Sequence, residues 1–346
     1  MDDREQQRIA EKLQRQMEAF GQARTPLELQ IEEDRIVVAG SQIFSVPKRW
    51  SFHQFLIMYG KNRLGADWLQ TYIVEKSKNH PLAAHILNAQ AVSPASISLQ
   101  ALDSVPLLMN GDLYAFLSFA YDLFTLADNA KMQESLLARV RNGDQYQGVR
   151  YEIYVAASLL RAGFSIEFED EADINNTHCE FTAKAKSTNK SFSVEAKSRH
   201  RPNGEAAAPT RAGMYRLLQA ALSKSANHER IIFADVNLPP DKMPLAMEDW
   251  HKEVMSTLSE LEDRQSSDRP WPTALIFFTN RIVSPWKSSA SGGSTVLLTA
   301  INHPLVKTPD KRPFQMQYPE IGKLFHAAAH LCRPPGEFFA QSIKSP

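Results

Sequence analysis

The strongest constraint on the fold is the order of apolar periodicities in the second half of the chain. Helical spacing and strand-like alternation succeed one another there in short, clearly separated segments. In chain order they predict a helix, three strands, a helix, a strand, a helix and a strand, over residues 145–164, 164–170, 178–185, 191–198, 211–226, 230–237, 247–262 and 274–280. Three strands joined by short turns and then by helical crossovers indicate an α/β fold with a mixed central sheet flanked by helices.

The first part of the chain has a mostly helical pattern with one small β element. Amphipathic spacing predicts a helix over 5–20, and residues 26–47 alternate like strands. Ser51 begins a Ser-x-x-Gln capping box, 111–127 is apolar on nearly every side, and a shorter helix is predicted at 131–141. We expect a helical N-terminal region, a sheet-bearing core and a C-terminal extension packing on that core, at 1–141, 142–285 and 286–346.

Composition narrows the class of protein. The chain has 39 Lys and Arg against 39 Asp and Glu, with 43% hydrophobic and 23% charged residues, which argues against a disordered, collagen-like or polybasic protein. Cys179 and Cys332 are its only cysteines, so it has no disulfide framework and no multi-cysteine zinc module. Its N-terminus lacks the apolar run of a secretory signal, and no segment approaches the roughly 20 apolar residues of a membrane span. We expect a cytoplasmic protein that does not enter a membrane.

Two predicted strands carry the residues best suited to chemistry. Alternation places Glu195 and Lys197 on one face of 191–198 and Glu180 on one face of 178–185. If these strands pair, the two carboxylates can converge with the lysine beside them. Such an oxygen-rich set suits Mg²⁺ or Mn²⁺ better than zinc, and the lysine could orient or deprotonate a metal-bound water. The alternative is an ordinary cross-strand Glu–Lys pair on a solvated face.

A third acid lies on the preceding helix. Glu152 falls on the same inward face as an apolar stripe formed by Val149, Ile153, Ala156 and Leu160. A carboxylate on an inward face costs free energy unless a cation or a donor meets it. We therefore interpret Glu152 as a further contributor to the metal cluster. The alternative is a salt bridge at the edge of the stripe, with Arg150 or Arg161.

Positive charge gathers next to these acids. Residues 184–224 contain nine Lys and Arg but only two acids, in a chain whose formal net charge is zero. A basic segment beside a carboxylate cluster favours a polyanionic substrate. An ordinary solvated basic loop remains the alternative for 197–204. The candidate nucleic-acid contacts are Lys184, Arg199, His200, Arg201 and Arg211.

Together these elements resemble the PD-(D/E)XK nuclease superfamily over roughly residues 145–240. In that family a helix supplies a glutamate, the second strand an acid, and the third strand a Glu-x-Lys tripeptide. The matching positions here are Glu152, Glu180 and Glu195 with Lys197. The resemblance implies a restriction-endonuclease-like core, a nucleic-acid partner with DNA favoured, and Mg²⁺- or Mn²⁺-dependent hydrolysis of phosphodiesters. The resemblance is also compatible with a homodimer.

Within the resemblance, each matching residue has an implied role. Glu180 and Glu195 hold the metal, Glu152 supports the metal or its water shell, and Lys197 positions the attacking water. One position departs from the family, which usually has aspartate where this chain has Glu180. Either the strand lies slightly further back, or Asp170 or Asp173 supplies the carboxylate, or the site has lost activity and only binds nucleic acid.

Two other functions remain open. The first is a catalytically inactive nucleic-acid-binding or scaffold protein on the same fold, with the helical N-terminal region as the partner-binding part. The second is a different metal hydrolase that uses His178, His200 and Glu180, although no His-Glu-x-x-His motif accompanies them.

Overall fold

A computed structural model describes residues 27–31, 33–76, 79–92, 109–168, 179–199, 211–236, 243–265, 268, 270–280, 295–303 and 317–338. The helix predicted at 5–20 lies outside these residues. No described helix combines the length and the apolar character needed to cross a lipid bilayer.

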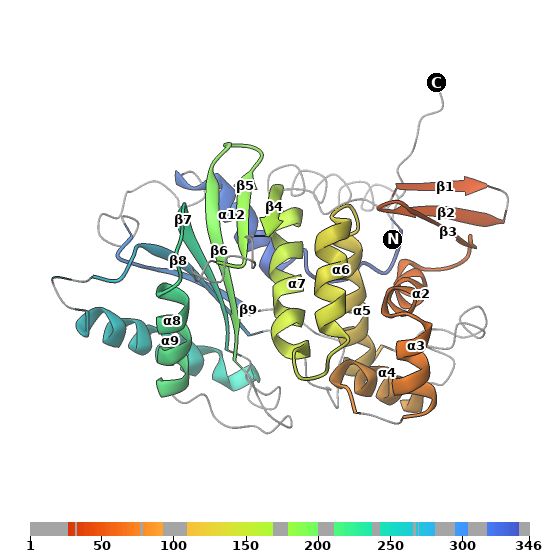
Figure 1. The fold of residues 1–346 in the computed structure, drawn as a ribbon, viewed down its shortest axis with the longest axis horizontal. Helices are drawn as coiled ribbons and strands as arrows, with labels where there is room; N and C mark the ends of the chain where they lie inside the picture. The colour runs from red at the N-terminus through yellow and green to blue at the C-terminus, as the bar shows by residue number, and fades with distance from the viewer. Residues whose placement is uncertain are drawn as a thin grey trace, which may run out of the picture.

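The described elements confirm the α/β fold class, with a mainly helical N-terminal region followed by a six-stranded mixed sheet packed with helices (Figure 1). The N-terminal elements are β1 (Leu27–Ile31), β2 (Asp34–Ala39), β3 (Gln42–Pro47), α2 (Phe52–Leu64), α3 (Ala66–Leu69), the π-helical segment η1 (Gln70–Val74), α4 (Pro81–Val92), α5 (Gly111–Thr125) and α6 (Ala130–Val140). The elements that follow are α7 (Tyr146–Arg161), β4 (Phe164–Phe168), β5 (Phe181–Ala185), β6 (Ser191–Ser198), α8 (Arg211–Leu222), β7 (Glu229–Asp235), α9 (Met243–Asp263), β8 (Ala274–Asn280), β9 (Thr295–Ile301) and α12 (Pro319–Ala329).

Local sequence signals set the N-terminal elements. Strands β1, β2 and β3 form a three-stranded antiparallel sheet from the segment that alternates between polar and apolar residues. Helix α2 begins with the predicted capping box: the Ser51 hydroxyl accepts from the Gln54 N–H, and the Gln54 side chain accepts from the Ser51 N–H. This box satisfies two backbone donors that would otherwise lack a partner at the helix start.

The large sheet has the strand order β4-β5-β6-β7-β8-β9. Strand β5 pairs antiparallel with β4 on one side and with β6 on the other. Strands β6, β7 and β8 are parallel, and β9 is antiparallel to β8. The parallel pairs require crossovers, and α8 and α9 provide them. The mixed sheet predicted from the element order is confirmed.

Helices cover both faces of this sheet. Phe192, Phe233 and Phe277 point toward α7 and α12 and join a core that continues without a break into α2, α4, α5 and α6. On the other face, Ile232 and Ile276 pack with α8 and α9 in a second core. Figure 1 shows α8 and α9 on one side of the sheet and α7 on the other, next to α6. The helical region and the sheet are thus joined through α7.

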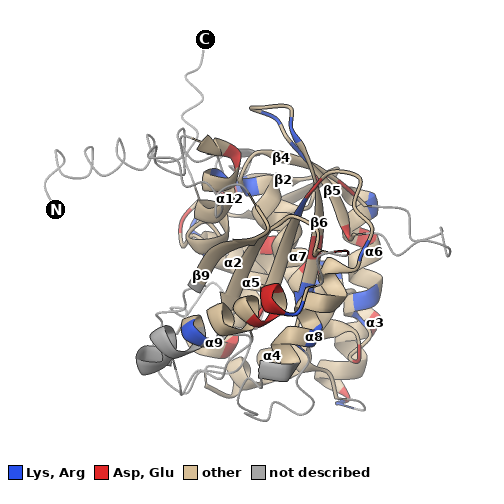
Figure 2. Ribbon diagram, turned by 90° about the vertical axis from the view of Figure 1, so that its left-hand side faces the viewer, with Lys and Arg blue, Asp and Glu red and all other residues tan. Residues whose placement is uncertain are grey.

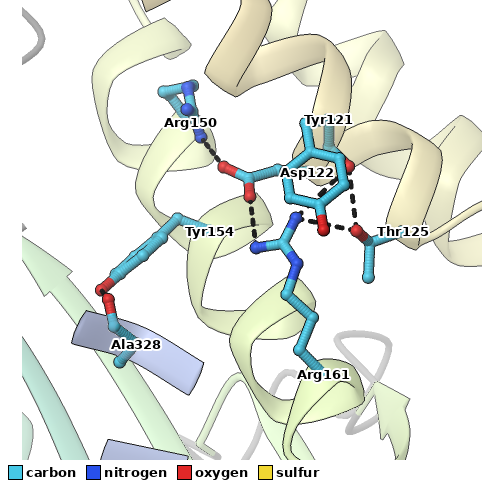
Figure 3. Close-up of polar contacts among 7 residues, drawn as sticks. All are labelled: Tyr121, Asp122, Thr125, Arg150, Tyr154, Arg161 and Ala328. Atoms are coloured by element: carbon cyan, nitrogen blue, oxygen red, sulfur yellow. Dashed lines mark hydrogen bonds and ion pairs between the residues drawn. The ribbon is translucent and has the colours of Figure 1, made fainter. Parts of the chain in front are cut away.

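A buried ion cluster fastens α5 to α7. Asp122 has no exposed side-chain surface and accepts from the guanidinium groups of Arg150 and Arg161, each at 2.8 Å. Arg161 also donates to the Thr125 hydroxyl at 2.8 Å and stacks on the ring of Tyr121 (Figure 3). These two arginines were the sequence-based alternatives for pairing with Glu152. They serve instead to bind α7 to the helical region.

The C-terminal part of the chain adds two elements that the pattern analysis did not assign. Strand β9 extends the sheet beside β8, and α12 packs on α7 and β9. The Tyr154 hydroxyl of α7 donates to the Ala328 carbonyl of α12 at 2.9 Å, which anchors the helix (Figure 3). Strand β9 and helix α12 therefore both contribute side chains to the core that lies against the sheet.

The turn between β2 and β3 gives a stability prediction. Gly40 has a φ of +62°, and a Cβ atom there would lie 2.2 Å from the backbone oxygen of Ala127. Gly40→Ala should lower the free energy of unfolding by about 3 kcal/mol, from left-handed strain and steric overlap combined. Denaturant unfolding measures this. Gly148→Ala, at an exposed helical position with open space around it, is the control and should be neutral or stabilising. An equal loss of stability in both variants would contradict the explanation by strain and steric overlap at Gly40.

Candidate functional site

Glu180, Glu195 and Lys197 converge where the pairing of β5 with β6 ends. The last pair in this register is Phe181 with Val194. Glu195 follows on β6, and Glu180 lies directly before β5 begins, not on the strand as the pattern predicted. The Lys197 ammonium nitrogen lies 2.6 Å from Glu195 Oε1 and 3.5 Å from Glu180 Oε1. Strand alternation had placed these three residues on one face, and the structure brings them together there.

Glu195 is the most deeply buried member of this group. Its side chain has 0% exposure, compared with 17% for Glu180 and 28% for Lys197. Burial raises the pKa of Glu195 to about 7; the Glu180 charge acts in the same direction, while Lys197 opposes both. An additional cation near this carboxyl group would therefore stabilise its ionised form.

Lys197 stays charged at this position. Burial by itself would lower the pKa of its ammonium group, but Glu195 and Glu180 outweigh that effect and raise the pKa above the ordinary value. A lysine with a raised pKa is a poor general base near neutral pH. The contribution that it could make to a reaction is therefore electrostatic: a fixed positive charge can orient a water molecule or offset negative charge on a phosphate.

Glu152 is buried on α7, as its inward position predicted, but its partner is Arg139. The two Glu152 oxygens accept from Arg139 Nη1 and Nη2 at 2.7 and 2.8 Å, a bidentate pair between α6 and α7. Burial raises the pKa of Glu152, and the Glu180 charge acts in the same direction. Arg139 and Lys197 act to lower this pKa but do not outweigh burial. Glu152 thus lies within electrostatic reach of Glu180 and Lys197, with an arginine across its carboxylate.

Helix α7 also fixes the end of β6 that carries Lys197. The Gln147 side chain donates to the Arg199 carbonyl at 2.6 Å, and the Arg199 N–H donates to the Asp235 carbonyl at 3.2 Å. Asp235, at the end of β7, accepts from the hydroxyl of Ser198 at 3.4 Å and from that of Thr279 at 3.0 Å. These bonds hold the strand end in place on both sides.

The predicted nucleic-acid contacts are only partly described. Lys184 is exposed on β5, and the Arg199 backbone is fixed at the end of β6. His200 and Arg201 lie outside the described residues, as do Asp170, Asp173 and His178, and the side chain of Arg211 is likewise not described. Figure 2 shows Lys and Arg positions along the protruding β5–β6 hairpin.

The residues present fit a cation held by two carboxylates. Among the described residues, no group of three or more His, Cys, Asp or Glu side chains is arranged to hold a metal ion. Within that same part of the chain, Glu195 Oε2 is buried without a hydrogen-bond partner. Magnesium commonly takes one or two carboxylates and completes its shell with water and substrate phosphate. Glu180 and Glu195 could supply that pair.

Arg139, Gln147 and Asp235 are the residues of this region that sequence reasoning missed. Arg139 belongs to a helix in the N-terminal region, and nothing in its local pattern connects it to a glutamate on the next helix. Asp235 carried the clearer signal, a carboxylate near the end of the predicted apolar strand 230–237. Polar side chains at the carboxyl ends of parallel strands commonly line functional sites.

Comparison with models of known protein families found no match, and comparisons with curated proteins and with solved structures found no similar chain.

Proposed function

We propose that this protein is a metal-dependent nuclease with a PD-(D/E)XK-type site, which hydrolyses phosphodiester bonds in DNA. The observation that carries the proposal is the convergence of Glu180 and Glu195 on Lys197, with a buried Glu195 oxygen that has no hydrogen-bond partner among the described residues. The order of elements around this group also resembles that superfamily, with Glu152 on the helix before the three antiparallel strands.

Each residue has a distinct part in the proposed reaction. Glu180 and Glu195 would hold Mg²⁺ or Mn²⁺, which supplies Lewis-acid polarisation of the phosphate and a more acidic bound water. Lys197, kept charged by its two carboxylates, offsets negative charge as the phosphate becomes pentacovalent. Gln147 and Asp235 hold the end of β6, so that Lys197 keeps its position during the reaction.

A long polyanionic substrate also suits the charge at the turn between β5 and β6, which lies at the opposite end of these strands from Glu180 and Glu195. The hairpin between β5 and β6 presents the exposed lysines Lys184 and Lys186, whereas Lys190 is paired with Glu229. Lysines on a protruding hairpin suit contacts with backbone phosphates, which position a duplex without reading its sequence. We expect the hairpin to contribute affinity that falls steeply with salt.

The test is cleavage of supercoiled plasmid with Mg²⁺, with Mn²⁺ and with EDTA. The wild-type protein should nick or linearise the plasmid only with an ion present. Lys197→Ala should reduce the rate at least about 100-fold while DNA binding persists, because one stabilising charge of this kind contributes 10²–10³-fold. Lys252→Ala, at an exposed position on α9, is the matched control. Cleavage that Lys197→Ala leaves unchanged would contradict the proposed site.

A second candidate is a nucleic-acid-binding protein that has lost catalysis. The observation that favours it is the bidentate Arg139 pair, which occupies both oxygens of Glu152. On this hypothesis the wild-type protein binds DNA but cleaves none of it with either ion. The same plasmid assay, together with a gel-shift measurement, separates the two candidates.

A further inference from the structure

Arg139 brings the helical N-terminal region into the candidate site. It lies on α6, in the region that precedes the sheet, and its side chain is 32% exposed, whereas that of Glu152 is 8% exposed. The guanidinium group meets Glu152 through two nearly equal distances, 2.7 and 2.8 Å. This bidentate geometry fixes both the direction in which the carboxylate points and the orientation of its plane. A single contact with a lysine would not fix the plane.

The same pair limits what Glu152 can do for a metal ion. Both oxygens already accept a charge-assisted hydrogen bond, and the guanidinium charge beside them opposes the approach of a cation. Each carboxylate oxygen still has a second lone pair, which can accept from a water molecule. Helix α7 packs on β6, and its Gln147 bonds the Arg199 carbonyl at the strand end that carries Lys197. This packing places α7 near the Lys197 end of the sheet, and the charges of Glu180 and Lys197 both act on Glu152.

We propose that Arg139 is a positioning residue, which holds the Glu152 carboxylate as an acceptor for the water shell of a cation bound by Glu180 and Glu195. Glu152 then orients water instead of binding the ion directly. This inference rests on the proposed function, because it requires a cation at Glu180 and Glu195. It assigns α6 a part in the site that the resemblance does not supply.

The experiment is titration of the full-length protein with Mn²⁺ alone, by calorimetry and by electron paramagnetic resonance of the free ion. Arg139→Gln should weaken Mn²⁺ binding about 10-fold, the size of effect typical when an outer-shell partner is lost. Arg139→Lys should recover only part of that loss, because an ammonium group lacks the bidentate geometry. In a Glu152→Gln background, Arg139→Gln should cause no further change.

Arg264→Gln is the matched control, since it breaks the ion pair between Glu260 of α9 and Arg264 just after that helix, and circular dichroism verifies folding of every variant. Tighter Mn²⁺ binding by Arg139→Gln would overturn the inference, because it would show that Arg139 competes with the ion for Glu152. Unchanged affinity would overturn it as well and leave a purely structural pair. Absence of Mn²⁺ binding by the wild-type protein would overturn the proposed function together with this inference.

Discussion

Glu195→Gln is expected to reduce metal-dependent DNA cleavage by about three orders of magnitude or more, because loss of an ion that supplies several kcal/mol of transition-state stabilisation has that effect. The glutamine keeps the size of the side chain but removes the charge that would hold the cation at the buried end of the site. Cleavage rates with saturating Mg²⁺ or Mn²⁺ measure the loss. Thermal unfolding gives a second readout, since Mn²⁺ should stabilise the wild-type protein and not the variant.

The same variant reports on the charge of Glu195 in the absence of metal. Burial raises the pKa of Glu195 from 4.5 to about 7. Between these pH values the folded protein holds a proton that the unfolded chain has released, so the stability contributed here falls as pH rises through the window. The variant lacks this dependence. Its melting temperature, measured relative to that of the wild-type protein, should therefore increase between pH 4.5 and pH 8.

Glu229→Gln is the control for the cleavage assay and for the Mn²⁺-dependent thermal unfolding. Glu229 is a partly buried glutamate at the start of β7, paired with Lys190 and His303. Burial acts to raise the pKa of Glu229, but its two partners outweigh burial and lower the pKa. We expect this variant to keep cleavage and the Mn²⁺ response. If Glu195→Gln cleaves at the wild-type rate, the carboxylate is not part of the catalytic site.

Asp122→Ala is expected to lower the free energy of unfolding by about 3–5 kcal/mol, because removing one partner from a buried ion pair leaves uncompensated charge in the interior. Here two guanidinium groups would remain, and Asp122, Arg150 and Arg161 are all nearly or fully buried (Figure 3). Chemical denaturation at neutral pH measures the loss. Because α7 also carries Glu152 and Gln147, the variant should cleave DNA more slowly at temperatures near its unfolding transition.

Two further variants test whether the buried charge causes the loss of stability in Asp122→Ala. Glu260→Gln breaks the pair with Arg264 at the end of α9, in which the arginine is exposed and the glutamate half-buried, and it should change stability by less than about 1 kcal/mol. Asp122→Asn keeps the volume and part of the hydrogen bonding, so its loss should fall between those of the other two variants. A loss below 1 kcal/mol for Asp122→Ala would mean that the arginines find other partners, and that the cluster does not stabilise the contact between α5 and α7.

Much of the fold followed from patterns within single segments. The capping box at Ser51, the apolar helix at 111–127 and the strand at 274–280 all occur where their patterns placed them. Strand β9 and helix α12 were missed as separate elements, because the C-terminal residues were interpreted only as an extension packing on the core. The segment 295–301 is a short apolar run of the kind whose secondary structure depends on what it packs against.

The partners of charged residues could not be predicted in the same way. Glu152 was expected to meet Arg150 or Arg161 if it formed an ion pair, since these arginines lie on the same helix. Residues two apart on a helix do not face each other, and both arginines turn to Asp122 on α5 instead. The actual partner, Arg139, lies on α6 and meets Glu152 through the packing of α6 against α7.

Periodicity along the chain was sufficient for the kinds and order of the elements from α7 to β8 and for the convergence of Glu180 and Glu195 with Lys197, because backbone geometry sets these locally. The burial of Glu195, the retained charge of Lys197 and the pairing of Glu152 with Arg139 came from contacts between segments far apart in the chain. Electrostatic interactions depend on distance and on exclusion of water, and both exist only once the helices have packed on the sheet.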